Sequence, residues 1–132
     1  MANNNSTQYT NMTTYRDTAN STGGRLRRNY WSCTVPTGSG DTMTVTKLPK
    51  GARFLGGGFQ WSAAQGATAT AAVGISGTTG KYRAAATTNV TTMVTFGTTP
   101  TENFGTETTA EETIIITNAA AVWTAGTCVG YI

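Results

Sequence analysis

The chain of 132 residues contains no histidine. Histidine is the commonest general base near neutral pH and the commonest metal ligand, so its absence excludes Ser-His-Asp and Cys-His catalytic arrangements. Neither of the two cysteines, Cys33 and Cys128, has a carboxylate at the short fixed spacing that a zinc site would need. We therefore expect no catalytic residue, no metal site, no cofactor and no enzymatic activity.

Charge and long apolar runs are also scarce. Charged residues make up 11% of the chain and the formal net charge is +3, which is modest for a nucleic-acid-binding protein. No run of about 18 apolar residues occurs, and the opening MANNNSTQYT has neither the basic nor the apolar region of a signal peptide. The composition predicts no nucleic-acid partner, no membrane span and no secretion signal.

Two glycine-rich stretches lack the features of phosphate-binding loops. GISGTTGKY (residues 74–82) and FLGGGFQW (residues 54–61) have no Lys-Ser/Thr pair and no helix after them. The first predicts a polar hairpin and the second a strand with a bulge, a bend or a close backbone contact. We expect no small-molecule substrate at either one.

Threonine is abundant, with thirty residues, and its branched side chain favours β-strands. From residue 29, short alternating runs recur about every ten residues, with turn residues between them. This pattern predicts an all-β fold, a jelly-roll or related antiparallel β-sandwich of about eight short strands, without a helix longer than about one turn. The expected strands are 30–35, 42–48, 52–62, 68–75, 81–85, 90–96, 112–118 and 126–132.

Alternation within these runs indicates which faces are buried. Met43 and Val45 alternate with threonines, so the threonine face is expected to be solvated or an interface. The unbroken run 114–116 (III) favours a central strand covered on both sides, or one that contacts a partner. Cys33 and Cys128 fall in the first and last apolar strands, where a closed sandwich could bring them together; two buried thiols are favoured over a disulfide.

Residues 1–28 are expected to form an extended N-terminal arm, and residues 29–132 the β-sandwich domain. The arm has almost no aliphatic residue except Leu26, so it must lie on its own neighbours or on another protein to become ordered. Tyrosine and arginine commonly anchor protein contacts, and RLRRNYW (residues 25–31) favours a protein interface over a solvated turn or a nucleic-acid site. The candidate contact residues are Tyr9, Tyr15, Arg16, Arg25, Arg27, Arg28, Tyr30 and Trp31.

The stretch KLPKGARFLGGGFQW (residues 47–61) combines a turn with a glycine-bearing strand. Pro49 and Gly51 are expected to turn the chain, and Gly56, Gly57 and Gly58 to allow a neighbouring backbone to pack closely. Simple alternation places residues 55, 57, 59 and 61 on one face and residues 54, 56, 58 and 60 on the other. The polar segment 97–112 is expected to be a solvated loop, or else to offer its carboxylates to a basic partner.

Several of these pieces, in this order, resemble the small capsid cement or head-decoration proteins of tailed bacteriophages. The pieces are the LPKGAR turn before the glycine-bearing strand, TATAAVGIS, GKYRAA and the closing ETIIITNAAAVWTAGTCVGYI, which together span about residues 42–132. The resemblance implies a jelly-roll or related sandwich that forms a small oligomer, a dimer or trimer, on the outside of an icosahedral shell. It implies a virion protein, made in the host bacterial cytoplasm, that bridges neighbouring major-capsid subunits and stabilises the shell. The arm lies outside the resembling region.

A phage fibre, receptor-binding or carbohydrate-binding module is the alternative function. Trp31, Trp61 and Trp123 could stack on sugars in such a module, although burial in the core is the more usual place for a tryptophan.

Overall fold

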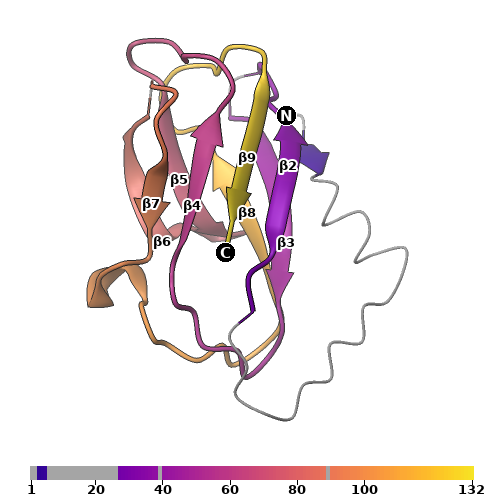
Figure 1. Cartoon of the computed structure of the whole chain (residues 1–132), viewed down its shortest axis with the longest axis vertical. Coiled ribbons are helices and arrows are strands. Elements are labelled where there is room, and N and C mark those ends of the chain that lie inside the picture. The colour runs from indigo at the N-terminus through magenta and orange to yellow at the C-terminus, as the bar shows by residue number, and fades with distance from the viewer. Residues whose placement is uncertain (1–2, 6–26, 39, 89) are drawn as a thin grey trace.

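In the computed structural model of the chain, two β-sheets pack face to face around one hydrophobic core (Figure 1). The structure describes residues 3–5, 27–38, 40–88 and 90–132. Its strands are β1 (Asn3–Asn5), β2 (Tyr30–Thr34), β3 (Thr42–Leu48), β4 (Gly57–Trp61), β5 (Thr70–Ile75), β6 (Thr78–Thr87), β7 (Val94–Phe96), β8 (Glu112–Thr117) and β9 (Thr127–Tyr131). Within these residues the one helical element is the 3-10 turn η1 (Pro100–Glu102).

The strand pairing is that of a jelly roll. One sheet has the order β2-β9-β4-β7, and the other has the order β1-β3-β8-β5-β6. Strands β2 and β9, β3 and β8, β4 and β7, and β5 and β6 pair antiparallel. The chain from β2 to β9 is therefore one long hairpin, with its tip at β5–β6, that rolls into two sheets. The predicted fold class is confirmed.

All eight predicted strands are present, and residues 42–48 match β3 at both ends. The glycine-bearing strand is shorter than predicted because Gly56 has φ +99°, a conformation that interrupts regular alternation. As a result Phe54 is buried and Leu55 is 52% exposed, so the prediction that Leu55 shares a face with Phe59 and Trp61 was wrong.

A bulge in β3 changes which threonines face the core. Met43 pairs with Ile116 and Thr44 with Ile115, but Thr46 pairs with Ile114, so Val45 is the extra residue. A shift of one residue turns the next side chain to the other face, and Thr46 lies in the interior with an exposed fraction of 0%. Thr44 is also buried, at 3%. Both alternatives for the threonine face, solvent and an interface, are therefore wrong at these two positions, because both side chains are buried within the chain.

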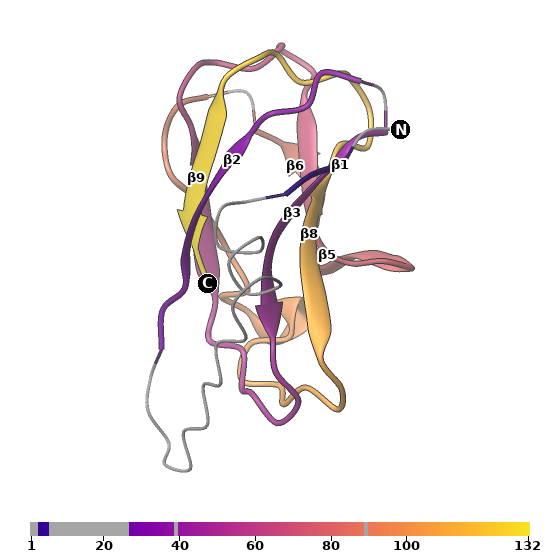
Figure 2. The same ribbon diagram turned by 90° about the vertical axis from the view of Figure 1, so that its right-hand side faces the viewer.

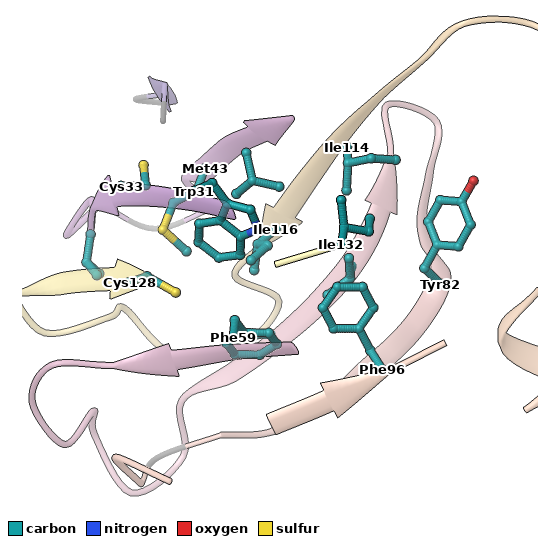
Figure 3. Close-up of a cluster of buried hydrophobic side chains, with 14 of the residues drawn as sticks. Trp31, Cys33, Met43, Phe59, Tyr82, Phe96, Ile114, Ile116, Cys128 and Ile132 are labelled. Carbon is teal, nitrogen blue, oxygen red and sulfur yellow. The ribbon is translucent and has the colours of Figure 1, made fainter. Parts of the chain in front are cut away.

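The core lies between the sheets and is rich in aromatic rings (Figure 3). Phe59 and Trp61 from β4 meet edge to face with ring centroids 5.5 Å apart, a favourable arrangement. Ile114 and Ile116 of the central strand β8 are fully buried, whereas Ile115 points to the outer face and is partly exposed. The III run is therefore a central strand, as predicted, but only one of its faces is fully covered.

The hairpin of β5 and β6 projects outward from the five-stranded sheet (Figure 2). Ile75 pairs with Thr78 across a two-residue turn at Ser76 and Gly77, and residues 76–80 are exposed. The polar hairpin predicted from GISGTTGKY is confirmed.

Candidate functional site

The junction between the arm and β2 presents one aromatic residue to solvent and the next to the core. Successive side chains of a strand point to opposite faces, and Tyr30 is 63% exposed whereas Trp31 is 4% exposed. Figure 3 shows the Trp31 ring among the core side chains. The prediction that Trp31 contacts a partner was wrong, because alternation places its side chain inside the sandwich.

Arg28 joins Tyr30 to Tyr131, its cross-strand neighbour on β9. The Arg28 guanidinium lies 4.7 Å from the centre of the Tyr131 ring and 5.9 Å from that of Tyr30. It also donates a 3.3 Å hydrogen bond to the Tyr30 hydroxyl, which raises the pKa of the Arg28 guanidinium above its usual value. The three side chains form a permanently cationic, aromatic cluster at the root of the arm.

The same outer face continues across the four-stranded sheet. Val129, two residues before Tyr131 on β9, is 43% exposed, and Met93 before β7 is 47% exposed. A side chain added at Gly58 would lie 3.0 Å from the Met93 sulfur and 3.2 Å from the Tyr131 ring, so both residues flank the same bare strip of backbone. We call Arg28, Tyr30, Met93, Val129 and Tyr131 together the tyrosine face.

The acidic residues of the described chain are engaged elsewhere. Of the carboxylates in the segment 97–112, Glu102 accepts a hydrogen bond from the Thr98 amide, and the other three form ion pairs. These ion pairs are Lys47–Glu111, Arg53–Glu107 and Lys81–Glu112. Because each carboxylate is used within the chain, the suggested contact between this segment and a basic partner loses its support.

Arg27 and Arg28 have no such neighbour: no carboxylate among the described residues lies within salt-bridge distance of either. Arg27 is exposed beside Arg28 at the start of the described domain. The tyrosine face therefore combines the charge of Arg28, which no described carboxylate pairs with, and exposed apolar and aromatic surface. That combination is typical of protein interfaces, where arginine, tyrosine and methionine are enriched.

The turn at Pro49 and the glycines that follow it are held by close backbone contacts. Gly51, with φ +82°, and Pro49 are fixed to Thr108 by hydrogen bonds of 2.8 Å and 2.6 Å. In β4, a side chain at Gly57 would meet the Tyr131 carbonyl oxygen at 2.5 Å and the Phe96 ring at 2.6 Å. Close approach of β4 to β9 and β7 thus depends on the absence of a side chain at Gly57.

The polar groups buried in the sandwich are engaged structurally. Glu112 of β8 accepts hydrogen bonds from the Tyr82 hydroxyl and from the Lys81 ammonium group, both on β6. Burial, and to a lesser degree the contact with Glu112, raise the pKa of Tyr82. This cluster links β6 to β8 and keeps the Tyr82 phenol protonated.

The two cysteines face each other across β2 and β9, as Cys33 and Cys128 are direct cross-strand partners. Both are buried free thiols, and burial raises the pKa of Cys33 to about 11 and that of Cys128 further. At neutral pH they are protonated and poor nucleophiles. No group of three metal-binding side chains is found among the described residues.

The described part of the chain also has no helix long and apolar enough to cross a membrane.

The tryptophans are all interior, with exposed fractions of 4%, 1% and 1% for Trp31, Trp61 and Trp123. The Trp123 indole donates a 3.0 Å hydrogen bond to the Thr70 carbonyl oxygen. None of the three presents a ring on which a sugar could stack, which removes the residues that favoured a carbohydrate-binding module.

Of the other predicted contact residues, Tyr9, Tyr15, Arg16 and Arg25 lie outside the described residues. The structure brings Arg28 and Tyr30 together, with Arg27 next to them. Sequence reasoning missed Val129 and Tyr131, although alternation in TCVGYI, with Cys128 inward, places both outward. Met93 gave no signal, because its position depends on how β7 packs beside β4.

Two solved structures share this fold. A chain in the capsid of Ralstonia phage GP4 aligns with a TM-score of 0.65 and 20% identity, covering 82% of this chain and 81% of that one. A chain of the cyanophage Pam1 capsid asymmetric unit aligns with a TM-score of 0.58 and 22% identity, covering 87% of this chain and 97% of that one. No family model matches the chain, and no curated protein sequence matches it significantly. At these identities the likeness shows the fold alone.

Proposed function

We propose that this chain is a structural protein of a phage virion that binds the outer surface of an icosahedral capsid and bridges neighbouring major-capsid subunits. The observation that carries the proposal is the likeness of nearly the whole jelly roll to chains from two phage capsids. The sequence resemblance to cement and head-decoration proteins rests on separate grounds and points the same way.

The contact surface that we propose is the tyrosine face together with the N-terminal arm. The face provides a cation, two tyrosines and two apolar side chains on and directly beside one sheet, and the arm joins the domain beside Tyr30. A carboxylate of a capsid subunit placed at Arg28 would find no competing acid among the described residues. Repetition of the contact over a shell adds avidity, so a modest affinity per copy is sufficient.

A binding assay with purified shells tests this proposal. Shells that lack the protein are mixed with the purified chain, sedimented and analysed by gel densitometry for the number of bound copies. We expect saturable binding of hundreds of copies per shell, because a cement protein occupies every equivalent junction. No sedimentation with shells, or binding of only a few copies per particle, would contradict the proposal.

Deletion of residues 2–24 tests how much the N-terminal arm contributes to binding of the capsid shell. The hydrophobic core comes from residues 31–132, so the shortened chain is expected to fold while shell binding becomes much weaker. Circular dichroism and thermal unfolding of the shortened chain serve as the folding control. Equal affinity of the full and shortened chains would show that the arm takes no part.

A further inference from the structure

Strand β1 is bound where the edges of the two sheets meet (Figure 2). It pairs parallel with β3, from Asn3 opposite Thr42 to Asn5 opposite Thr44. Asn4 also reaches the other sheet: its side-chain amide donates a 3.0 Å hydrogen bond to the Thr34 carbonyl oxygen, and the Cys33 thiol donates a 3.2 Å hydrogen bond to the Asn4 carbonyl oxygen. We call the edge of β3 at Thr42–Thr44, with Cys33 and Thr34 of β2, the β1 site.

The β1 site is a binding site for an extended peptide. β2 is the edge strand of the four-stranded sheet, and β3 would be the edge strand of the other sheet on this side if β1 did not form its parallel ladder with Thr42–Thr44. Such edges accept an added strand through main-chain hydrogen bonds. The interactions described for β1 are the backbone ladder and polar hydrogen bonds of this kind, and β1 contributes no residue to the hydrophobic core.

The connection between β1 and the domain is long enough for β1 to bind either to its own domain or to that of a second copy of the chain. Residues 6–26 form a link of 21 residues between Asn5 and Arg27. A chain segment of 21 residues can span at most about 70 Å. A domain of about 104 residues has a radius of gyration of about 13 Å, so 21 residues are enough chain to connect β1 to a neighbouring domain.

We propose that the β1 site is occupied by residues 3–5 of a second copy of this chain, so that copies are joined by strand exchange. The contacts of β1 are identical whichever chain supplies it, so exchange gives up no hydrogen bond. Because the strand carries no core residue, its release from its own domain exposes no part of the hydrophobic core. Two copies that exchange reciprocally make both contacts at once, which strengthens a bond that is weak singly.

This exchange concerns copies of the chain and is independent of the proposed binding to a capsid. It is therefore tested on the isolated protein in solution, where a failure would say nothing about shell binding.

Disulfide trapping between two different chains provides the test. The donor chain carries Asn4→Cys and Cys33→Ala, and the acceptor chain is the unaltered protein with Cys33. A thiol at position 4 lies close to Cys33 only when the donor strand occupies the acceptor's β1 site. After the two chains are mixed and oxidised with oxidised glutathione at about pH 9, where part of the buried Cys33 is ionised and can exchange, we expect a disulfide-linked heterodimer on a non-reducing gel, abolished by reductant.

The single variant Asn4→Cys, which retains Cys33, is the companion measurement. Exchange predicts covalent dimers and larger species, whereas a strand retained by its own domain predicts a monomer that is lighter by two hydrogens. An exclusively intramolecular disulfide, or no disulfide involving position 4 in either experiment, would overturn the proposal. The donor chain alone, which lacks Cys33, is the control and should give neither product.

Discussion

Gly57 shows how one missing side chain fixes the distance between strands. Its position leaves no space for a Cβ atom, since the nearest atom is the backbone oxygen of Tyr131 at 2.5 Å, and a backbone cannot move aside as a flexible side chain can. The carbonyl oxygen of Tyr131 faces Gly57, and the side chain of Tyr131 is part of the tyrosine face. The position of that face therefore depends on the close packing of β4 against β9.

Replacement of Gly57 by valine is expected to destabilise the domain by about 3 kcal/mol or more, since overpacking is added to a backbone clash. Urea denaturation measures the loss. Gly66→Ala is the matched control, because nothing lies within 4 Å of a Cβ added at Gly66, and its stability should change by less than about 0.5 kcal/mol. Equal stabilities of the two variants would show that β4 and β9 can separate freely.

Tyr30 and Arg28 are exposed, so their contribution should appear in binding and not in folding. Tyr30→Ala is expected to weaken binding to capsid shells about tenfold or more, because it removes both an aromatic anchor and the hydrogen bond that orients Arg28. Thermal unfolding should change little. Lys50→Ala, which removes an exposed cation elsewhere on the domain, is the control and should bind as the unaltered chain does. A Tyr30→Ala variant with unchanged affinity would remove the tyrosine face from the proposed contact.

At the scale of elements, two adjacent glutamates at the start of β8 have opposite environments. Glu112 is 9% exposed and joins β8 to Lys81 and Tyr82 of β6, whereas Glu111 is 61% exposed in its ion pair with Lys47. An exposed ion pair is screened by water, but an amide in place of the buried Glu112 carboxylate has one acceptor oxygen in place of two, so either Lys81 or Tyr82 loses its acceptor, and Lys81 loses its counter-charge.

Glu112→Gln is accordingly expected to lower the free energy of unfolding by about 2 kcal/mol. Glu111→Gln, the matched control, should lower it by no more than about 0.5 kcal/mol. Chemical denaturation of both variants at pH 7 gives the comparison. Similar losses in the two variants would mean that the Lys81–Glu112–Tyr82 cluster does not hold β6 against β8.

The strands were predictable because most of their residues follow a local rule. Alternation in TMTVTKL gives β3 its bounds, and the turn residues of GISGTTGKY give the β5–β6 hairpin. Alternation fails where the backbone departs from a regular strand: the positive φ of Gly56 exchanges the expected positions of Phe54 and Leu55, and the bulge at Val45 turns Thr46 inward. The pairing of β1 with β3 was also missed, since an NNN sequence has no apolar pattern to indicate a strand.

The candidate site was predictable only in part, for a related reason. Arg28 and Tyr30 are close together in the sequence, so a cation–aromatic junction could be recognised. Tyr131 and Met93 join them through strand pairing between distant segments, which no local pattern shows.

At the scale of the whole molecule, the buried thiols couple the stability of the sandwich to pH. Burial raises the pKa of Cys33 from 9.0 to about 11 in the folded chain, so folding favours the protonated thiol. Its contribution to stability is complete below pH 9 and is lost as the pH rises toward 11, because the unfolded chain releases the proton first. Cys128 and Tyr82, whose pKa values burial also raises, act in the same direction.

We therefore expect the free energy of unfolding to fall steadily between pH 9 and pH 11. Urea denaturation at intervals of one pH unit measures this slope. Cys33→Ala should give a smaller fall over the same range, although its stability at pH 7 is lower. A slope that is the same with and without Cys33 would mean that its thiol does not titrate as a buried group.

The pairing of β2 with β9, the first and last strands of the jelly roll, also determines when the tyrosine face can form during folding. Tyr30 and Tyr131 are neighbours in space but about one hundred residues apart in the chain, and Ile132 is the residue that pairs with Asn29. During synthesis β2 leaves the ribosome about one hundred residues before β9, so the four-stranded sheet can close only after β9 has also emerged. Such distant pairings make folding slow. Chains that stop before β9 thus carry β2 but no assembled face, and only molecules that contain both strands can compete for a partner.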